Sequence, residues 1–159
     1  MKAVVILLAA ALLIGCQSQD DLRKMMREEI TRASAKTFYP SADVIGPYSP
    51  AVQVGPFLFV SGQIGLNPQT GAFDGDDIES QTHQALTNLT AALARAGFDS
   101  SDVVQCSVFL KDMKDFQKMN LIYGGFFAEG HYPTRTTVEV SNLPKNARVE
   151  ISAVAYKSK

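Results

Sequence analysis

Arg135 is the residue of this sequence whose type and position most clearly suggest chemistry on a small molecule. It lies in the stretch HYPTRTTVEV, which alternates like a β-strand from Thr134 onward. One side of that strand carries Arg135, Thr137 and Glu139, and the other carries Thr134, Thr136, Val138 and Val140. A guanidinium in this place is either an exposed strand charge or a fixed clamp for a carboxylate, which its paired planar donors match. The strand pattern alone leaves both interpretations open.

Few other residues have the types and spacing that catalysis or metal binding requires. His83 and His131 lack companion ligands at metal-binding spacing, so we expect no metal site. The sequence has no GxxxxGK[ST], GxGxxG or GxSxG motif. Cys106 lies in the apolar strand pattern VVQCSVFL, which favours a buried, inert thiol over a nucleophile.

The composition is typical of one soluble globular domain. The chain has 159 residues, 46% of them hydrophobic and 19% charged, and no internal repeat. Its formal net charge is −1 and its Lys and Arg residues form no cluster, so we expect no nucleic-acid partner.

The first residues are typical of an export signal. A short apolar run from Ala3 to Ile14 follows Lys2 and is too short to span a bilayer as a helix. It closes on LIGC, which resembles the lipobox of bacterial lipoproteins. That resemblance implies a signal peptide over 1–15, lipidation of Cys16, and an outer-membrane destination because Gln17 follows. The alternative is a plain secretory signal. With Cys16 acylated, Cys106 has no partner for an intramolecular disulfide.

The rest of the chain divides into a tether and a domain. We interpret residues 16–41 as a flexible, lipid-anchored tether, although Leu22, Met25, Met26 and Ile30 have the spacing of a short amphipathic helix. The domain at 42–159 begins with a hairpin that turns at Gly55-Pro56. The elements expected after it are a helix from Asp77 or Ile78 to Gly97, a strand at 103–110, a helix at about 112–129, and strands at 134–141 and 148–157.

This β-β-α-β-α-β-β order predicts an α+β domain with helices on one face of a mixed sheet. Several side chains on the other sheet face are apolar or small, and that face must also be covered. The pattern therefore indicates self-association.

Four stretches of the domain resemble the RidA/YjgF family of reactive-intermediate deaminases. They are IGPYSPAVQVGPFLFVSGQIGLNPQTG, DIESQTHQALTNLTAALARAG, DVVQCSVFLKDMKDFQKMNLIYGGFF and YPTRTTVEVSNLPKNARVEISAVA, in order from about residue 42 to residue 156. The resemblance implies a chorismate-mutase-like fold, a homotrimer and clefts between neighbouring subunits. It also implies cofactor-independent hydrolysis of 2-aminoacrylate and related enamines or imines to a 2-oxo acid and ammonia.

The resemblance gives roles to individual residues. Arg135 matches the arginine that grips the substrate carboxylate, and Glu150 matches the acid that positions the attacking water. Tyr48 and Asn120 match cleft-lining positions, and Ser61-Gly62 matches a segment whose backbone approaches the ligand. We expect Arg135 to face away from the helix-packed side, toward the neighbouring subunit and its ligand.

Two residues depart from the family pattern. Thr137 stands where archetypal members often carry Cys, and Pro50 stands where Gln is usual, which removes a donor and stiffens the cleft edge. The leading hypothesis is an enamine/imine deaminase, because Arg135 and Glu150 are both present. The alternatives are a non-catalytic trimer that binds small carboxylates at the cell envelope and a purely structural trimer.

Overall fold

The computed structural model describes residues 18–41 and 46–158, and the chain falls into two compact units with a boundary between Ala35 and Lys36. In the first unit, helix α2 spans Gln19–Ser34. Acidic residues in its first turn stabilise the helix through its dipole. This part of the stretch expected to be a flexible tether is therefore a helix, which was the alternative interpretation. The expected signal peptide, Cys16 and Gln17 lie outside the described residues. No helix in the described part of the chain is long and apolar enough to cross a membrane.

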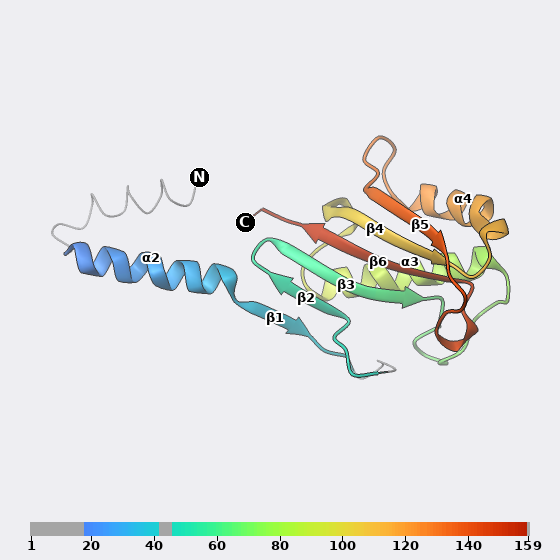
Figure 1. Ribbon diagram of the computed structural model, residues 1–159, viewed down its shortest axis with the longest axis horizontal. Coiled ribbons are helices and arrows are strands. Elements are labelled where there is room, and N and C mark those ends of the chain that lie inside the picture. The colour runs from blue at the N-terminus through green and yellow to red at the C-terminus, as the bar shows by residue number, and fades with distance from the viewer. Residues whose placement is uncertain (1–17, 42–45, 159) are drawn as a thin grey trace. The chain divides into compact units, whose positions relative to one another are not determined.

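The second unit is built on a six-stranded mixed sheet (Figure 1). Its strands are β1 (Lys36–Tyr39), β2 (Ala51–Val54), β3 (Phe57–Ile64), β4 (Val103–Leu110), β5 (Thr134–Glu139) and β6 (Val149–Tyr156). They lie in the order β1-β2-β3-β6-β4-β5, and β5 pairs parallel with β4 while the other pairs are antiparallel. The expected hairpin turn is confirmed, with Gly55 at a φ of 58°. Strand β1 was not expected from the sequence, because it is short and falls within the polar stretch.

Helix α3 (Ile78–Arg95) begins and ends where the sequence predicts. Asp77 caps its first turn, and its carboxylate accepts a hydrogen bond of 2.7 Å from the Ser80 backbone N–H. The helix stops before Gly97, which takes a left-handed φ of 77°. Helix α4 (Phe116–Phe126) follows a short 3₁₀ turn that Asp112 caps, and it ends earlier than expected because Phe127 is extended.

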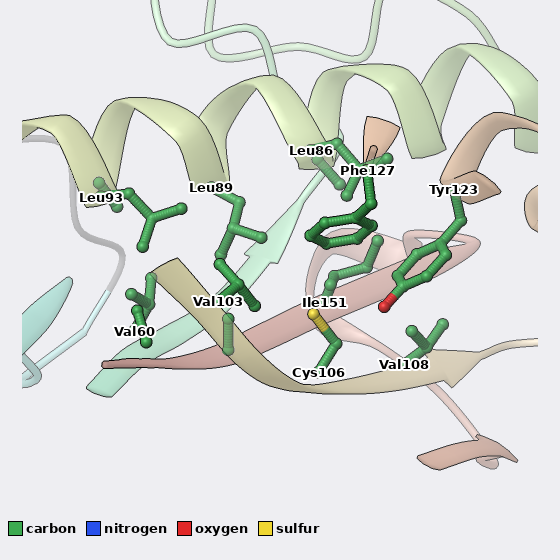
Figure 2. Packing of buried hydrophobic residues seen from close by; sticks show 14 of the residues in the cluster. Val60, Leu86, Leu89, Leu93, Val103, Cys106, Val108, Tyr123, Phe127 and Ile151 are labelled. Atoms are coloured by element: carbon green, nitrogen blue, oxygen red, sulfur yellow. The ribbon is translucent and has the colours of Figure 1, made fainter. Parts of the chain in front are cut away.

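Helices α3 and α4 cover one face of the sheet, as predicted, and the core lies between them and the strands (Figure 1). Figure 2 shows helix side chains pointing toward strand side chains from the facing layer. The fully buried members of this cluster include Leu86, Leu89 and Leu93 from α3, Met119 from α4, and Cys106, Val108 and Ile151 from the strands. This packing fixes which face each strand residue occupies.

The other sheet face is apolar and uncovered in a single chain. Along β3, Leu58 and Val60 are buried beneath the helices, so the alternating Phe57 and Phe59 point to the opposite face. Phe38, Phe57, Phe59, Val138 and Tyr156 are all at least 40% exposed. Large apolar side chains gathered on one face of a sheet are typical of a surface that another chain covers.

Candidate functional site

Arg135 lies on the helix-covered side of the sheet, and the expectation that it faces away from the helices is wrong. In the parallel β4–β5 ladder, Arg135 pairs with Cys106 and Thr137 pairs with Val108. Paired residues share a face, and Cys106 and Val108 are completely buried under the helices. Because β5 is the edge strand, Arg135 reaches the rim of this layer rather than its centre.

The guanidinium of Arg135 is held by two aromatic rings of helix α4. Its central carbon lies 4.5 Å from the centroid of the Tyr123 ring and 5.7 Å from that of Phe116. Arg135 is half-buried, and no carboxylate of the described residues lies within ion-pair distance of it. Its planar donors are therefore free to bind an anion.

Arg148 is an arginine of the same domain whose donors are occupied by a carboxylate. Its Nε and Nη2 donate to both carboxylate oxygens of Asp115 at 2.8–3.0 Å. Asp115 is only 7% exposed, so this bidentate pair ties the start of helix α4 to the segment before β6. Arg135 differs from Arg148 in that no described carboxylate occupies its donors.

Two buried hydroxyls near Arg135 lack hydrogen-bond partners among the described residues. They are the Oγ1 of Thr137 and the phenolic oxygen of Tyr123. Burial, with the neighbouring Cys106 thiol adding to it, raises the pKa of Tyr123 far above its ordinary value. Burial also raises the pKa of Cys106. The expectation that Cys106 is a buried thiol is confirmed.

Asn120 lies on the same flank of helix α4 as the two rings. It follows Phe116 by four positions and precedes Tyr123 by three, so helical periodicity places all three side chains on one side. Unlike the rings, Asn120 is exposed. The structure thus brings Arg135, Thr137 and Asn120 to one edge of the domain.

Glu150 lies on the opposite, uncovered face of the sheet. It alternates along β6 with Val149 and Ile151, which are completely buried under the helices, and it pairs with Ile64 and Phe109. Burial raises the pKa of its carboxyl group. The Glu150 side chain lies across Gly62, because a Cβ placed on Gly62 would come within 1.8 Å of the Glu150 Oε1. Glycine at 62 is therefore what makes room for this carboxylate.

Ser61 and Tyr48 lie near Glu150 rather than near Arg135. The Ser61 hydroxyl donates to the Ser49 carbonyl at 2.7 Å, and the Ser61 N–H donates to the Pro50 carbonyl at 2.9 Å. These bonds coincide with an irregularity in the β3–β6 ladder between Val60 and Gln63. The segment before β2 is thereby held against β3.

A depression of about 330 Å³ lies beside this segment. Tyr48, Pro50 and Gly62 line it together with Asn88 from helix α3. Asn88 donates to the carbonyls of Ile64 and Leu66 at 2.9 and 2.8 Å, so it fixes the chain that leaves β3. This role could not be predicted, because Asn88 looks like an ordinary polar residue within a helix.

The candidate residues thus form two groups on opposite faces of one sheet. Arg135, Thr137 and Asn120 lie at the β5–α4 edge, whereas Glu150, Gly62, Ser61 and Tyr48 lie along β3 and β6. One chain cannot place the arginine and the glutamate on the same small ligand. The described residues also contain no group of three or more His, Cys, Asp or Glu side chains that could hold a metal ion.

Known proteins are similar to this chain in sequence and fold. The family model described as endoribonuclease L-PSP matches residues 40–157. A RutC family protein of Pyrococcus horikoshii is 50% identical over 113 residues, which span 71% of this chain and 89% of the relative. The 2-iminobutanoate/2-iminopropanoate deaminase of Salmonella typhimurium is 41% identical over 115 residues, again spanning 71% of this chain and 89% of the relative.

A solved structure gives the same result for the fold. The crystal structure of E. coli TdcF with bound serine superimposes with a TM-score of 0.69 at 39% identity, covering 76% of this chain and 94% of TdcF. The match with the family model covers most of the chain and almost the whole second unit. On this sequence and fold evidence, the chain belongs to the RidA/YjgF (Rid) family.

Proposed function

We propose that this protein hydrolyses small 2-imino acids and their enamine forms, of the 2-aminoacrylate type, to 2-oxo acids and ammonia. The observation that carries the proposal is Arg135, a half-buried guanidinium held by aromatic rings, with no carboxylate of the described chain to neutralise it. A site of this kind suits a small ligand with one carboxylate. The name of the Salmonella relative, an imine deaminase, supports the same reaction class.

The reaction makes modest demands on the protein. The enamine takes a proton at its terminal carbon and becomes an imine, whose C2 is electrophilic. Water adds to C2, a C–O bond forms, the nitrogen gains a proton, and the C–N bond breaks to release ammonia and leave the 2-oxo acid. Arg135 would hold the carboxylate so that attack is effectively intramolecular. Glu150 would orient the water and take its proton, and its raised pKa suits a group that must also return a proton.

The site is proposed to form between copies of the chain in a homotrimer. The opposite faces occupied by Arg135 and Glu150 support this arrangement, since a neighbouring copy can bring its Glu150 to the arginine. The exposed apolar side chains on the uncovered face give the copies a surface to bury. Tyr48, Ser61 and Gly62 would then line the cleft from the Glu150 side, and Asn120 and Thr137 from the Arg135 side.

Subunit mixing tests the reaction and the assembly together. The Arg135→Ala and Glu150→Gln variants should each lose most of their activity. They are unfolded together, refolded as one mixture and assayed with 2-aminoacrylate generated in situ. If each site takes its arginine and its glutamate from different copies, about one site in four is restored by random mixing. No recovery of activity in trimers shown to be mixed would exclude a shared site. A stable monomer by light scattering would exclude the trimer.

A second candidate function is capture of small carboxylates without turnover. The TdcF structure with bound serine favours it, because that relative holds an amino acid. Calorimetric titration with pyruvate and the 2-aminoacrylate assay separate the two functions. Pyruvate binding without hydrolysis above the spontaneous rate would favour capture. An RNA-cleavage assay is added as a control, because the matching family model is described as an endoribonuclease.

We also propose that the protein is an exported lipoprotein. Its Cys16→Ser variant should accumulate as an unprocessed precursor that lacks the acyl mass. The support is the short apolar run that ends at LIGC, with Cys16 as its last residue. Gln17 after the cysteine favours the outer membrane as the destination. Mass spectrometry of the wild-type chain from membrane fractions measures the acyl groups, and a lipid-free mature chain in the soluble fraction would refute the anchor.

A further inference from the structure

We propose that Tyr123 is a positioning residue for Arg135, whose aromatic ring holds the guanidinium in the place where it meets the substrate carboxylate. The inference rests on the proposed function of Arg135 as the carboxylate clamp. The Tyr123 ring centroid lies 4.5 Å from the guanidinium carbon, closer than the Phe116 ring at 5.7 Å. Both distances are within the range of attractive cation–π contacts.

The ring constrains Arg135 without using up its donors. A guanidinium on a flexible side chain loses rotamer entropy when a ligand fixes it, so prior fixation strengthens binding. An ion pair would fix it too, but would consume the N–H groups, as Asp115 does with those of Arg148. An aromatic face attracts the charge and accepts no strong hydrogen bond. Tyr123 therefore leaves the donors of Arg135 free for a carboxylate.

Tyr123 is itself firmly held. It is 3% exposed, and its ring packs against Phe127 with centroids 5.0 Å apart. Figure 2 shows Tyr123 of helix α4, and Phe127 just after that helix, reaching toward Cys106 and Val108 of β4. The ring thus belongs to the rigid core on one side and supports Arg135 on the other.

The ring, and not the hydroxyl, is assigned this role. The Tyr123 hydroxyl is buried and has no hydrogen-bond partner among the described residues. Phenylalanine at this position would keep the aromatic surface and lose an unpaired polar group. Leucine would keep an apolar side chain and lose the aromatic face.

The test compares three variants of the full-length chain, Tyr123→Phe, Tyr123→Leu and Phe98→Leu. Pyruvate binding is measured by calorimetry, and kcat and KM are measured with 2-aminoacrylate generated in situ. Tyr123→Leu should weaken pyruvate binding and raise KM by about 2- to 30-fold, the range of a cation–π contact. Tyr123→Phe should match the wild type. Phe98→Leu is the matched control, since Phe98 is buried in the same core but makes no ring contact with Tyr123, and should lower the thermal midpoint while leaving pyruvate affinity unchanged.

A double variant shows whether Tyr123 acts through Arg135. In an Arg135→Ala background, Tyr123→Leu should cause no further loss of kcat/KM. Wild-type affinity in Tyr123→Leu, or an equal loss in Tyr123→Phe or Phe98→Leu, would overturn the assignment. Pyruvate binding that follows this pattern in a protein that hydrolyses no imine would refute the deaminase function and leave the positioning role standing. A wild-type chain that binds no pyruvate would refute both.

Discussion

Replacing Arg135 by alanine tests the proposed site most directly. The variant removes the guanidinium but leaves β5 paired with β4 through its backbone, so the sheet should persist. Its side chain is half-buried at an edge, and it forms no ion pair with the described residues. We therefore expect folding and assembly to survive while binding of the carboxylate is lost.

The size of the loss follows from the type of contact. A hydrogen bond to a charged group contributes about 1.5–3 kcal/mol, which corresponds to roughly 10- to 150-fold in affinity. Because the Tyr123 and Phe116 rings already cover part of the guanidinium, a ligand displaces less water from it. Turnover should fall further than affinity, since a carboxylate that is not held leaves C2 misplaced for attack. Arg135→Lys should recover little of either, because an ammonium lacks the planar paired donors.

The assay follows 2-oxo acid release from 2-aminoacrylate generated in situ, corrected for spontaneous hydrolysis. Circular dichroism and light scattering on the same samples establish that Arg135→Ala is folded and assembled. If the alanine variant hydrolyses the substrate and binds pyruvate as the wild type does, Arg135 is a solvated strand charge and the proposed site is wrong.

The remaining predictions concern the other half of the site and the core. Since burial raises the pKa of Glu150 above its ordinary 4.5, the acidic limb of the pH profile of kcat/KM should lie above pH 4.5, and it should be absent from the residual activity of Glu150→Gln. Gly62→Ala should displace the Glu150 carboxylate and lower kcat while sparing pyruvate binding. Gly65→Ala, whose Cβ would meet the Gln81 backbone at 2.6 Å, should instead lower the thermal midpoint. Leu89→Ala, at a completely buried position, should reduce the free energy of unfolding by about 2–5 kcal/mol in denaturant titrations at fixed protein concentration.

The elements with strong local signals could be predicted from the sequence. Helix α3 has a capping aspartate at 77, an apolar stripe and a glycine at 97, and the structure begins and ends it accordingly. Strand β6 was predicted at 148–157, and its regular alternation is seen in the burial of Val149, Ile151, Ala153 and Ala155. In both elements, the local preference for helix or strand agrees with the burial pattern.

The face of β5 could not be predicted in the same way. Val138 and Val140 made the side opposite Arg135 look like the core side, yet Val138 is 40% exposed. The deciding fact is the parallel register with β4, which places Arg135 beside Cys106. Register between strands far apart in sequence depends on the whole sheet, and an edge strand carries a weak burial signal of its own. The contact of the Tyr123 ring with Arg135 could not be predicted either, because it depends on the same strand register.

The position of the two charged residues connects the fold to the proposed assembly. Each face of the sheet offers one half of a site: the helix side ends in an arginine that no described carboxylate neutralises, and the open side presents a half-buried glutamate over a glycine. Had both lain on one face of one chain, they would have paired with each other, as Arg148 and Asp115 do. Separation by the sheet keeps the arginine free for a carboxylate and keeps the glutamate able to exchange a proton. The exposed apolar face would then serve the chemistry as well as stability, because burying it against another copy is what brings unlike halves together.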